Sequence, residues 1–210
     1  MLFLEADRNP SEEFGGGDSG SFDPNAYNLG SAIARESGYD TDSFARLQEW
    51  VHEVFPEVSR PLAPPKGQGG FLASKEKRVR FPIPRRAMSS GVVHGMAILA
   101  RLAFAPSESV VVVEEPEIHQ HPQALNKLVE RFLQQSTEKQ LLVITHSQDI
   151  IFHQGIPPDN FWFVRREDGG PSLVSQVHRE KDINWIEGKL TGNAGEEPGQ
   201  VPPPDHPPSE

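Results

Sequence analysis

The chain has 210 residues and a formal net charge of −10, and it contains no cysteine. This length suffices for one domain with a substantial core, and the lack of cysteine excludes a disulfide framework, a thiolate zinc site and a cysteine nucleophile. No apolar run reaches the roughly 18 residues that span a bilayer, and acidic residues near the start argue against a secretory signal, so we expect a cytoplasmic protein that does not enter a membrane.

The first part of the chain alternates between apolar and loop-like stretches. Residues 1–10 open with an apolar run that predicts a first strand. Residues 11–30 are rich in glycine, serine and aspartate, which predicts a flexible loop. From Ser43, the expected N-cap, apolar side chains recur at helical spacing as far as Pro56.

The next segment is rich in proline and glycine. Residues 59–70 are interpreted as a linker, and residues 71–84 as an edge strand or a half-exposed strand. Near the end, residues 161–164 and 173–177 flank a turn sequence and predict a hairpin. Residues 191–210 are rich in proline and acid and are expected to form a disordered tail.

The centre of the chain has the pattern of a strand, a helix and a second strand. Four consecutive valines at 110–113 predict a strand buried on both faces, as in a parallel sheet covered by helices. Pro122 begins a helix with an apolar stripe, and residues 141–144 predict a second buried strand. Such a βαβ unit makes the two strands parallel neighbours, so we predict an α/β fold with a mainly parallel sheet.

Acidic residues and a histidine follow the two buried strands. Glu114 and Glu115 come after the first strand, and His146 comes after the second. Ligands of open α/β sheets bind outside the carboxyl ends of the strands, so we expect these side chains in one crevice. Carboxylates there need a cationic partner, which hydrated Mg²⁺ with nucleotide phosphates would provide. Glu114 is then the candidate metal ligand, Glu115 would orient the attacking water, and His146 would sense or stabilise the γ-phosphate.

Ser89, Ser90 and Gly91 precede a helix that extends to about residue 105. Backbone N–H groups, a hydroxyl and the positive end of the helix dipole together make an anion site, which a γ-phosphate would fit. A plainer interpretation is that Ser89 caps the helix and Gly91 relieves steric crowding.

Three stretches carry a family resemblance: M-S-S-G-V-V-H-G-M-A-I-L-A-R-L, V-V-V-V-E-E-P-E-I-H-Q-H-P and L-L-V-I-T-H-S. They resemble the ABC-like branch of P-loop ATPases, and above all the AAA-type ATPases grouped with the overcoming-lysogenization-defect, RecF and SMC proteins. The resemblance covers residues 1–190 and is specific over 88–148. It implies a partial three-layer P-loop NTPase fold, ATP and Mg²⁺ as cofactors, and ATP hydrolysis. By this resemblance Ser89 and Gly91 match the signature motif, Glu114 the Walker B acid (usually Asp), Glu115 the catalytic glutamate and His146 the switch histidine.

The phosphate loop of that family has no counterpart here. The pattern G-x-x-x-x-G-K-[ST] does not occur in the sequence, and the glycine-rich stretch 66–70 lacks its Gly-Lys-Ser/Thr ending. In the family this loop lies upstream of the residue that is Met1 here, so residues 31–190 resemble the C-terminal half of an ATPase domain. We expect the chain alone to bind ATP weakly or not at all, and to need an ATPase half or a full-length relative that supplies Walker A. The alternative is a non-catalytic interaction subunit or a truncated fragment of such an ATPase.

Two further patterns leave alternatives open. His119 and His121 alternate with Glu115 and Glu117, which would suit a hydrolytic metal centre or simple hydrogen bonding in a turn. Residues 75–86 hold six cations against Glu76 alone, which suits either a surface for the DNA backbone or a solvated basic face. No aromatic interleaving along this stretch supports stacking with single strands. Any nuclease or effector would come from a partner. The cations are Lys75, Lys77, Arg78, Arg80, Arg85 and Arg86.

Overall fold

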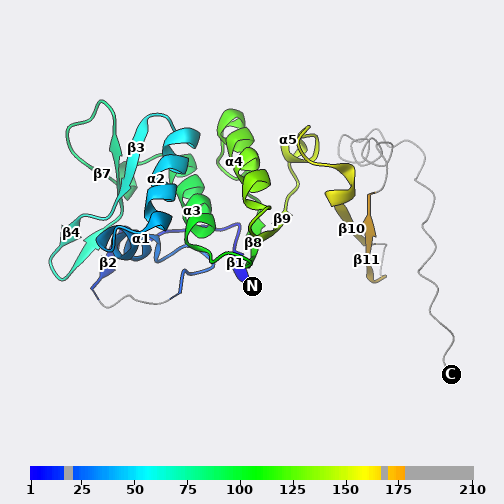
Figure 1. Ribbon diagram of the computed structural model, residues 1–210, viewed down its shortest axis with the longest axis horizontal. Coiled ribbons are helices and arrows are strands. Elements are labelled where there is room, and N and C mark those ends of the chain that lie inside the picture. Colours follow the sequence, from blue (N-terminus) through cyan, green and yellow to red (C-terminus); the bar gives the residue numbers. More distant parts are fainter. Residues whose placement is uncertain (17–20, 167–169, 178–210) are drawn as a thin grey trace, which may run out of the picture. The chain divides into compact units, whose positions relative to one another are not determined.

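The computed structural model describes residues 1–16, 21–166 and 170–177. The chain divides into two units, Met1–Ile150 and Ile151–Glu210, each of which is described by itself (Figure 1). The tail predicted over 191–210 lies outside the described residues, as does the end of the predicted ATPase domain from residue 178 onward. Within the described part of the chain, no helix is long and apolar enough to cross a membrane.

A three-stranded parallel sheet forms the centre of the first unit. Its order is β1 (Leu2–Leu4), β8 (Val110–Glu114) and β9 (Gln140–Ile144). Leu4 pairs with Val113, and Val113 pairs with Val143, so the carboxyl ends of all three strands lie at one edge. The predicted α/β class with a parallel sheet is confirmed.

Four helices share one hydrophobic core with this sheet: α1 (Leu29–Gly38), α2 (Asp42–Val54), α3 (Ser90–Phe104) and α4 (Pro122–Gln135). Figure 1 shows α2 and α3 side by side, and α4 follows β8 as the crossover to β9. Pro122 is in the first turn of α4, as predicted. The N-cap of α2 is Thr41, whose hydroxyl accepts a hydrogen bond from Phe44 N–H at 3.1 Å, so the prediction of Ser43 was wrong.

β8 and β9 differ in how their two faces are covered. Val112, on the face of β8 opposite the main core, is only 3% exposed. On β9, Leu141 and Val143 pack against the core, whereas Leu142 and Ile144 are 52% and 43% exposed. The prediction that both strands are buried on both faces is therefore wrong for β9. The physical reason is that the described residues leave this face of β9 largely uncovered at Leu142 and Ile144, whereas the same face of β8 is covered at Val112.

Two small antiparallel sheets flank the helices of the first unit. One has the order β2 (Glu13–Gly15), β5 (Gly69–Phe71) and β4 (Pro65–Lys66). The other has the order β3 (Val58–Leu62), β6 (Ala73–Glu76) and β7 (Ile83–Pro84), followed by the 3₁₀ turn Arg85–Ala87.

These sheets correct two sequence predictions. The segment predicted as a flexible loop contains β2 and the start of α1, with Ala26 and Leu29 fully buried. The segment predicted as a linker contributes β4 and parts of β3 and β5. Glycine serves close packing here, because a Cβ on Gly69 would lie 1.9 Å from the carbonyl oxygen of Phe14 in the neighbouring strand β2.

The second unit begins with the last residue of the short helix α5 (Gln148–Ile151) and contains the 3₁₀ turn Pro158–Asn160. It also contains the antiparallel strands β10 (Trp162–Arg166) and β11 (Ser172–Gln176), in which Val164 pairs with Val174. This pairing confirms the predicted hairpin.

Candidate functional site

The carboxyl edge of the parallel sheet gathers the polar residues that follow its strands. Glu114 pairs with Ile144 in the β8–β9 register, so Glu115 and His146 emerge at the same edge. The N–H of Glu115 donates to the carbonyl of Ile144 at 2.7 Å. One carboxylate oxygen of Glu114 accepts a bond from the N–H of Ala6 at 3.3 Å. We call this edge, with the segments 5–8, 114–117 and 145–147, the acidic rim.

Arg8 is a buried cation in the acidic rim. Its side chain is 1% exposed. Its guanidinium donates to the carbonyl oxygens of Glu5 and Glu114, both at 2.7 Å, and of Glu115 at 2.8 Å. Burial lowers the pKa of Arg8 to about 10, opposed by the nearby carboxylates of Glu117, Glu115 and Glu114. Arg8 therefore stays charged at neutral pH and ties the segment after β1 to the segment after β8.

Glu115 has a backbone conformation that non-glycine residues rarely adopt, with φ at +40°. Its N–H is bonded to β9 and its carbonyl to Arg8, so two contacts hold this conformation. Its half-buried carboxylate makes no hydrogen bond to any other described residue. Such backbone strain costs about 1–3 kcal/mol and concentrates at functional sites.

Glu117 connects the acidic rim to the end of β9. Its Oε1 accepts bonds from the Thr145 hydroxyl at 2.7 Å and from the His146 N–H at 3.0 Å. Its Oε2 is buried without a partner among the described residues. Because an unsatisfied buried carboxylate oxygen is costly, the site fits a cation or a hydrogen-bond donor at this position. The His146 side chain itself is exposed.

The start of α3 has the features of an ordinary helix cap. Ser89 is the N-cap, and its hydroxyl accepts a bond from Val92 N–H at 3.3 Å. Ser90 is exposed at the first position of the helix. The capping role considered from the sequence is thus present, and it occupies the Ser89 hydroxyl.

Gly91 lies against the turn that follows Glu117. A Cβ on Gly91 would lie 2.6 Å from the carbonyl oxygen of His119, closer than real side chains approach. The side-chain amide of Gln120 donates to the Gly91 carbonyl at 3.1 Å. Glycine therefore lets the start of α3 dock on the same loop that carries the rim acids.

The histidines of this loop do not form a metal centre. His119 packs edge to face against His94 of α3, with ring centroids 4.8 Å apart. His121 caps α4 by accepting a bond from Gln123 N–H at 3.3 Å. The described residues include no group of three or more histidine, aspartate or glutamate side chains placed to hold a metal. The alternative of a hydrolytic centre at His119 and His121 is therefore wrong, and turn packing explains these residues.

His94 is neutral at neutral pH. Burial lowers its pKa to about 4, and the neighbouring charges of Arg8 and Arg85 act in the same direction. Its Nδ1 atom is buried without a partner among the described residues.

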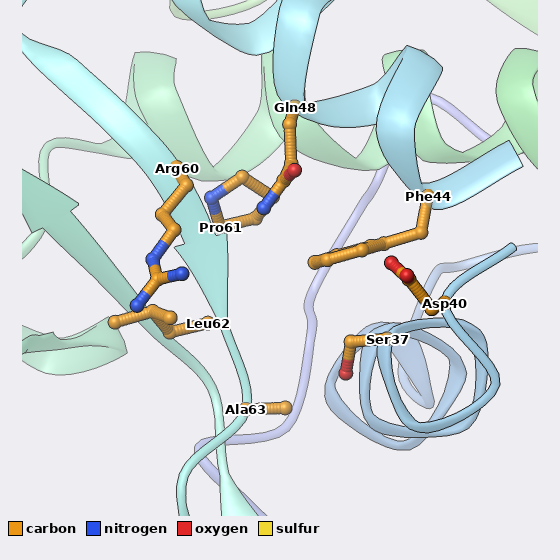
Figure 2. Close-up of a pocket in the computed structure, with 8 residues that line it drawn as sticks. All are labelled: Ser37, Asp40, Phe44, Gln48, Arg60, Pro61, Leu62 and Ala63. Atoms are coloured by element: carbon orange, nitrogen blue, oxygen red, sulfur yellow. The ribbon is translucent and has the colours of Figure 1, made fainter. Parts of the chain in front are cut away.

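A cavity of about 330 Å³ lies apart from these residues, between α1, α2 and β3 (Figure 2). Phe44 and Leu62 contribute to its apolar walls, and Asp40 and Arg60 contribute opposite charges. None of the residues singled out from the sequence lines it.

Sequence reasoning missed the parts played by Arg8 and Glu117. A signal for Arg8 was available, because a residue that follows a parallel strand emerges at the same edge as residues that follow its neighbours. Using that signal required the pairing of β1 with β8, which joins residues about a hundred positions apart. Glu117 was considered only as a metal ligand, whereas the structure uses it to hold the start of the loop after β9.

Comparison with known proteins defines the class. A structure from work on ATP-driven dimerization and DNA-stimulated activation of SMC ATPases has a TM-score of 0.59 and 17% identity, covering 80% of this chain and 99% of that chain. An Smc head domain with a coiled coil and joint from Pyrococcus yayanosii has a TM-score of 0.55 and 19% identity, and the match covers 71% of this chain and 28% of that chain. An Smc head domain from Pyrococcus furiosus, bound to the C-terminal domain of ScpA, has a TM-score of 0.54 and 19% identity, and the match covers 78% of this chain and 41% of that chain.

The fold is therefore similar to that of Smc head domains. Residues 7–151 match the family described as "AAA domain, putative AbiEii toxin, Type IV TA system", and because this match spans more than half of the chain, the chain belongs to that family. No curated protein matches it.

Proposed function

We propose that this chain contributes Walker B, switch and signature residues to ATP binding and hydrolysis, at a composite site whose phosphate loop comes from another polypeptide. The observation that carries the proposal is the meeting of Glu114, Glu115 and His146 at one edge of the parallel sheet. In this proposal Glu114 holds Mg²⁺, Glu115 orients the attacking water and His146 contacts the γ-phosphate.

The rim fits a bound cation but does not fit a triphosphate alone. The carboxylate of Glu114, which accepts one backbone N–H, and the orphaned Glu117 Oε2 are hard oxygen ligands suited to Mg²⁺, and the free Glu115 carboxylate is left for the attacking water. When bound, Mg²⁺ would neutralise charge that develops on the phosphates. Most of the affinity for the phosphates in such ATPases comes from a loop of amides and its lysine, and the 210 residues contain no such motif. Ser89, Ser90 and Gly91 would contribute helix N–H groups to the γ-phosphate of a composite site.

The edge of β9 supports a partner that brings the phosphate loop. β9 has no described neighbour on its outer side, and Leu142 and Ile144 leave apolar surface beside that edge. An unpaired apolar edge is a template for another strand. A phosphate loop follows the carboxyl end of its own strand, so a partner strand added parallel to β9 would bring its loop to the acidic rim.

ATP turnover of the chain alone and of its mixture with a candidate partner that carries a phosphate loop tests the proposal. We expect turnover only in the mixture, and we expect Glu115→Gln to abolish it. Glu138→Gln is the matched control, because Glu138 is an exposed acid outside the rim. If the chain and its partner bind each other but never hydrolyse ATP, the result would instead favour the alternative, a non-catalytic interaction subunit or truncated fragment. DNA and a separate nuclease or effector remain proposed partners of the working complex.

A further inference from the structure

The loop over residues 77–82 joins β6 to β7 at one of the antiparallel sheets (Figure 1). All six of its residues are exposed, including the apolar side chains of Val79 and Phe81. We call it the basic loop, because it carries Lys77, Arg78 and Arg80. It takes no part in the acidic rim.

The structure divides the six cations of this region into two groups. Lys75 donates to the carbonyls of Val79 and Arg80, at 2.5 and 2.9 Å. These two hydrogen bonds stabilise the conformation of the loop. Arg85 donates to the side chain of Asn9 at 2.7 Å, and Arg86 forms an ion pair with Glu12. These three cations therefore have structural partners.

The other three cations are available to a ligand. In the described part of the chain, Lys77, Arg78 and Arg80 form no ion pair. Two acids flank the base of the loop, since Glu76 ends β6 and the Glu57 carbonyl accepts the N–H of Lys77. Neither neutralises the loop, so its exposed part keeps a positive charge.

Phe81 adds a flat aromatic surface to this charge. It is 69% exposed, so it contributes little to the core. The guanidinium carbon of Arg80 lies over the ring, 5.5 Å from its centroid, so a cation already faces one side of the ring and a base would stack on the other side. The sequence pattern offers no interleaved aromatic residues in support of stacking, whereas the structure exposes a single ring, Phe81, next to Arg80.

We propose that the basic loop binds single-stranded nucleic acid, with an unpaired base stacked on Phe81 and phosphates contacted by Lys77, Arg78 and Arg80. Cations together with an exposed ring are the combination that binds single strands. An acidic peptide would use the cations alone, and a duplex hides the faces of its bases. The chain as a whole is acidic, so the contact must be local and sensitive to salt.

Fluorescence anisotropy of the full chain with an end-labelled oligothymidylate of roughly 20 nucleotides, which exceeds most known sites, tests this proposal. No nucleotide or partner is added, so the result is independent of the proposed ATPase. We expect Phe81→Ala to weaken binding about tenfold, in line with the energy of stacking one base. We expect Arg78→Gln with Arg80→Gln to reduce the slope of log K against log salt by about 1.4 between roughly 50 and 200 mM.

The control variant is Lys66→Gln with Lys127→Gln, which removes the same charge from cations that are paired with Glu13 and Glu130. It should bind nearly as wild type does. Absence of binding by the wild-type chain, or equal losses in the control and loop variants, would overturn the proposal. Tighter binding to a duplex of the same length, or an unaffected Phe81→Ala variant, would overturn the stacking site and leave only general electrostatic attraction. Circular dichroism of each variant verifies that it is folded.

Discussion

Arg8 and the basic loop place arginine in opposite settings. Arg8 is enclosed, bonded to three carbonyls and surrounded by carboxylates, whereas Arg78 and Arg80 are exposed and unpaired within the described chain. A buried cation with fixed partners determines structure, because its removal leaves desolvated acceptors behind. An exposed cation determines little of the structure and is free for a ligand. The same residue type therefore serves the fold in one region and, as we propose, recognition in the other.

The largest expected effect comes from Arg8→Met. It leaves three carbonyl oxygens without their donor and the rim acids without their cation, so the free energy of unfolding should fall by about 3–5 kcal/mol. The matched change Arg78→Met should stay within about 0.5 kcal/mol of wild type. Urea unfolding measures both. Similar losses in the two variants would remove the distinction between the two settings.

A smaller effect is expected from Gly91→Ala, which tests how the acidic rim is joined to α3. The added methyl group would meet the His119 carbonyl at 2.6 Å, so we expect a loss of about 1–3 kcal/mol of unfolding free energy. Gly38→Ala is the control, since a Cβ there meets nothing within 4 Å. Thermal unfolding of the two variants compares them. A neutral Gly91→Ala would mean that the loop after β8 moves freely away from α3.

The pH dependence of stability tests the buried surroundings of Arg8 through His94, whose pKa is lowered by burial and by the charge of Arg8. The pKa of His94 is about 4 in the folded chain, below its ordinary value of 6.5, so the unfolded state binds a proton more readily. The contribution of neutral His94 is complete above pH 6.5 and is lost as pH falls from 6.5 toward 4. His94→Phe should therefore lose less stability over this interval than wild type, measured by urea unfolding at several pH values. His146→Gln, a change at an exposed histidine, should follow the wild-type curve.

The smallest expected change in stability is at the edge of β9. Leu142→Lys should change the unfolding free energy by less than about 0.5 kcal/mol, because Leu142 is 52% exposed. It should nevertheless weaken association with a partner that adds a strand to β9, measured by analytical ultracentrifugation of the mixture. Tyr39→Lys, at a residue more exposed than Leu142, should leave association intact. If Leu142→Lys also left association unchanged, the partner would have to bind elsewhere.

The βαβ unit was predictable because its signals are local. Four valines in succession, Pro122 at a helix start and the apolar stripe of the next helix each act over a few residues, and the structure has β8, α4 and β9 in their places. The position of the rim acids followed from the rule for parallel strands. The antiparallel sheets were missed because their proline and glycine content resembles that of a loop, while their order comes from cross-strand pairs such as Glu13 with Phe71.

The sequence by itself determined the fold class, the family resemblance and the residues expected at the carboxyl edge of the sheet. These depend on periodicity and on motifs of short span, which any stretch of chain carries with it. Only the tertiary structure decided that Arg8 binds Glu114 across 106 positions, that β9 leaves one face exposed, and that three of six clustered cations are free. Such facts depend on which distant groups meet and on what covers each surface, and the local sequence pattern specifies neither of them.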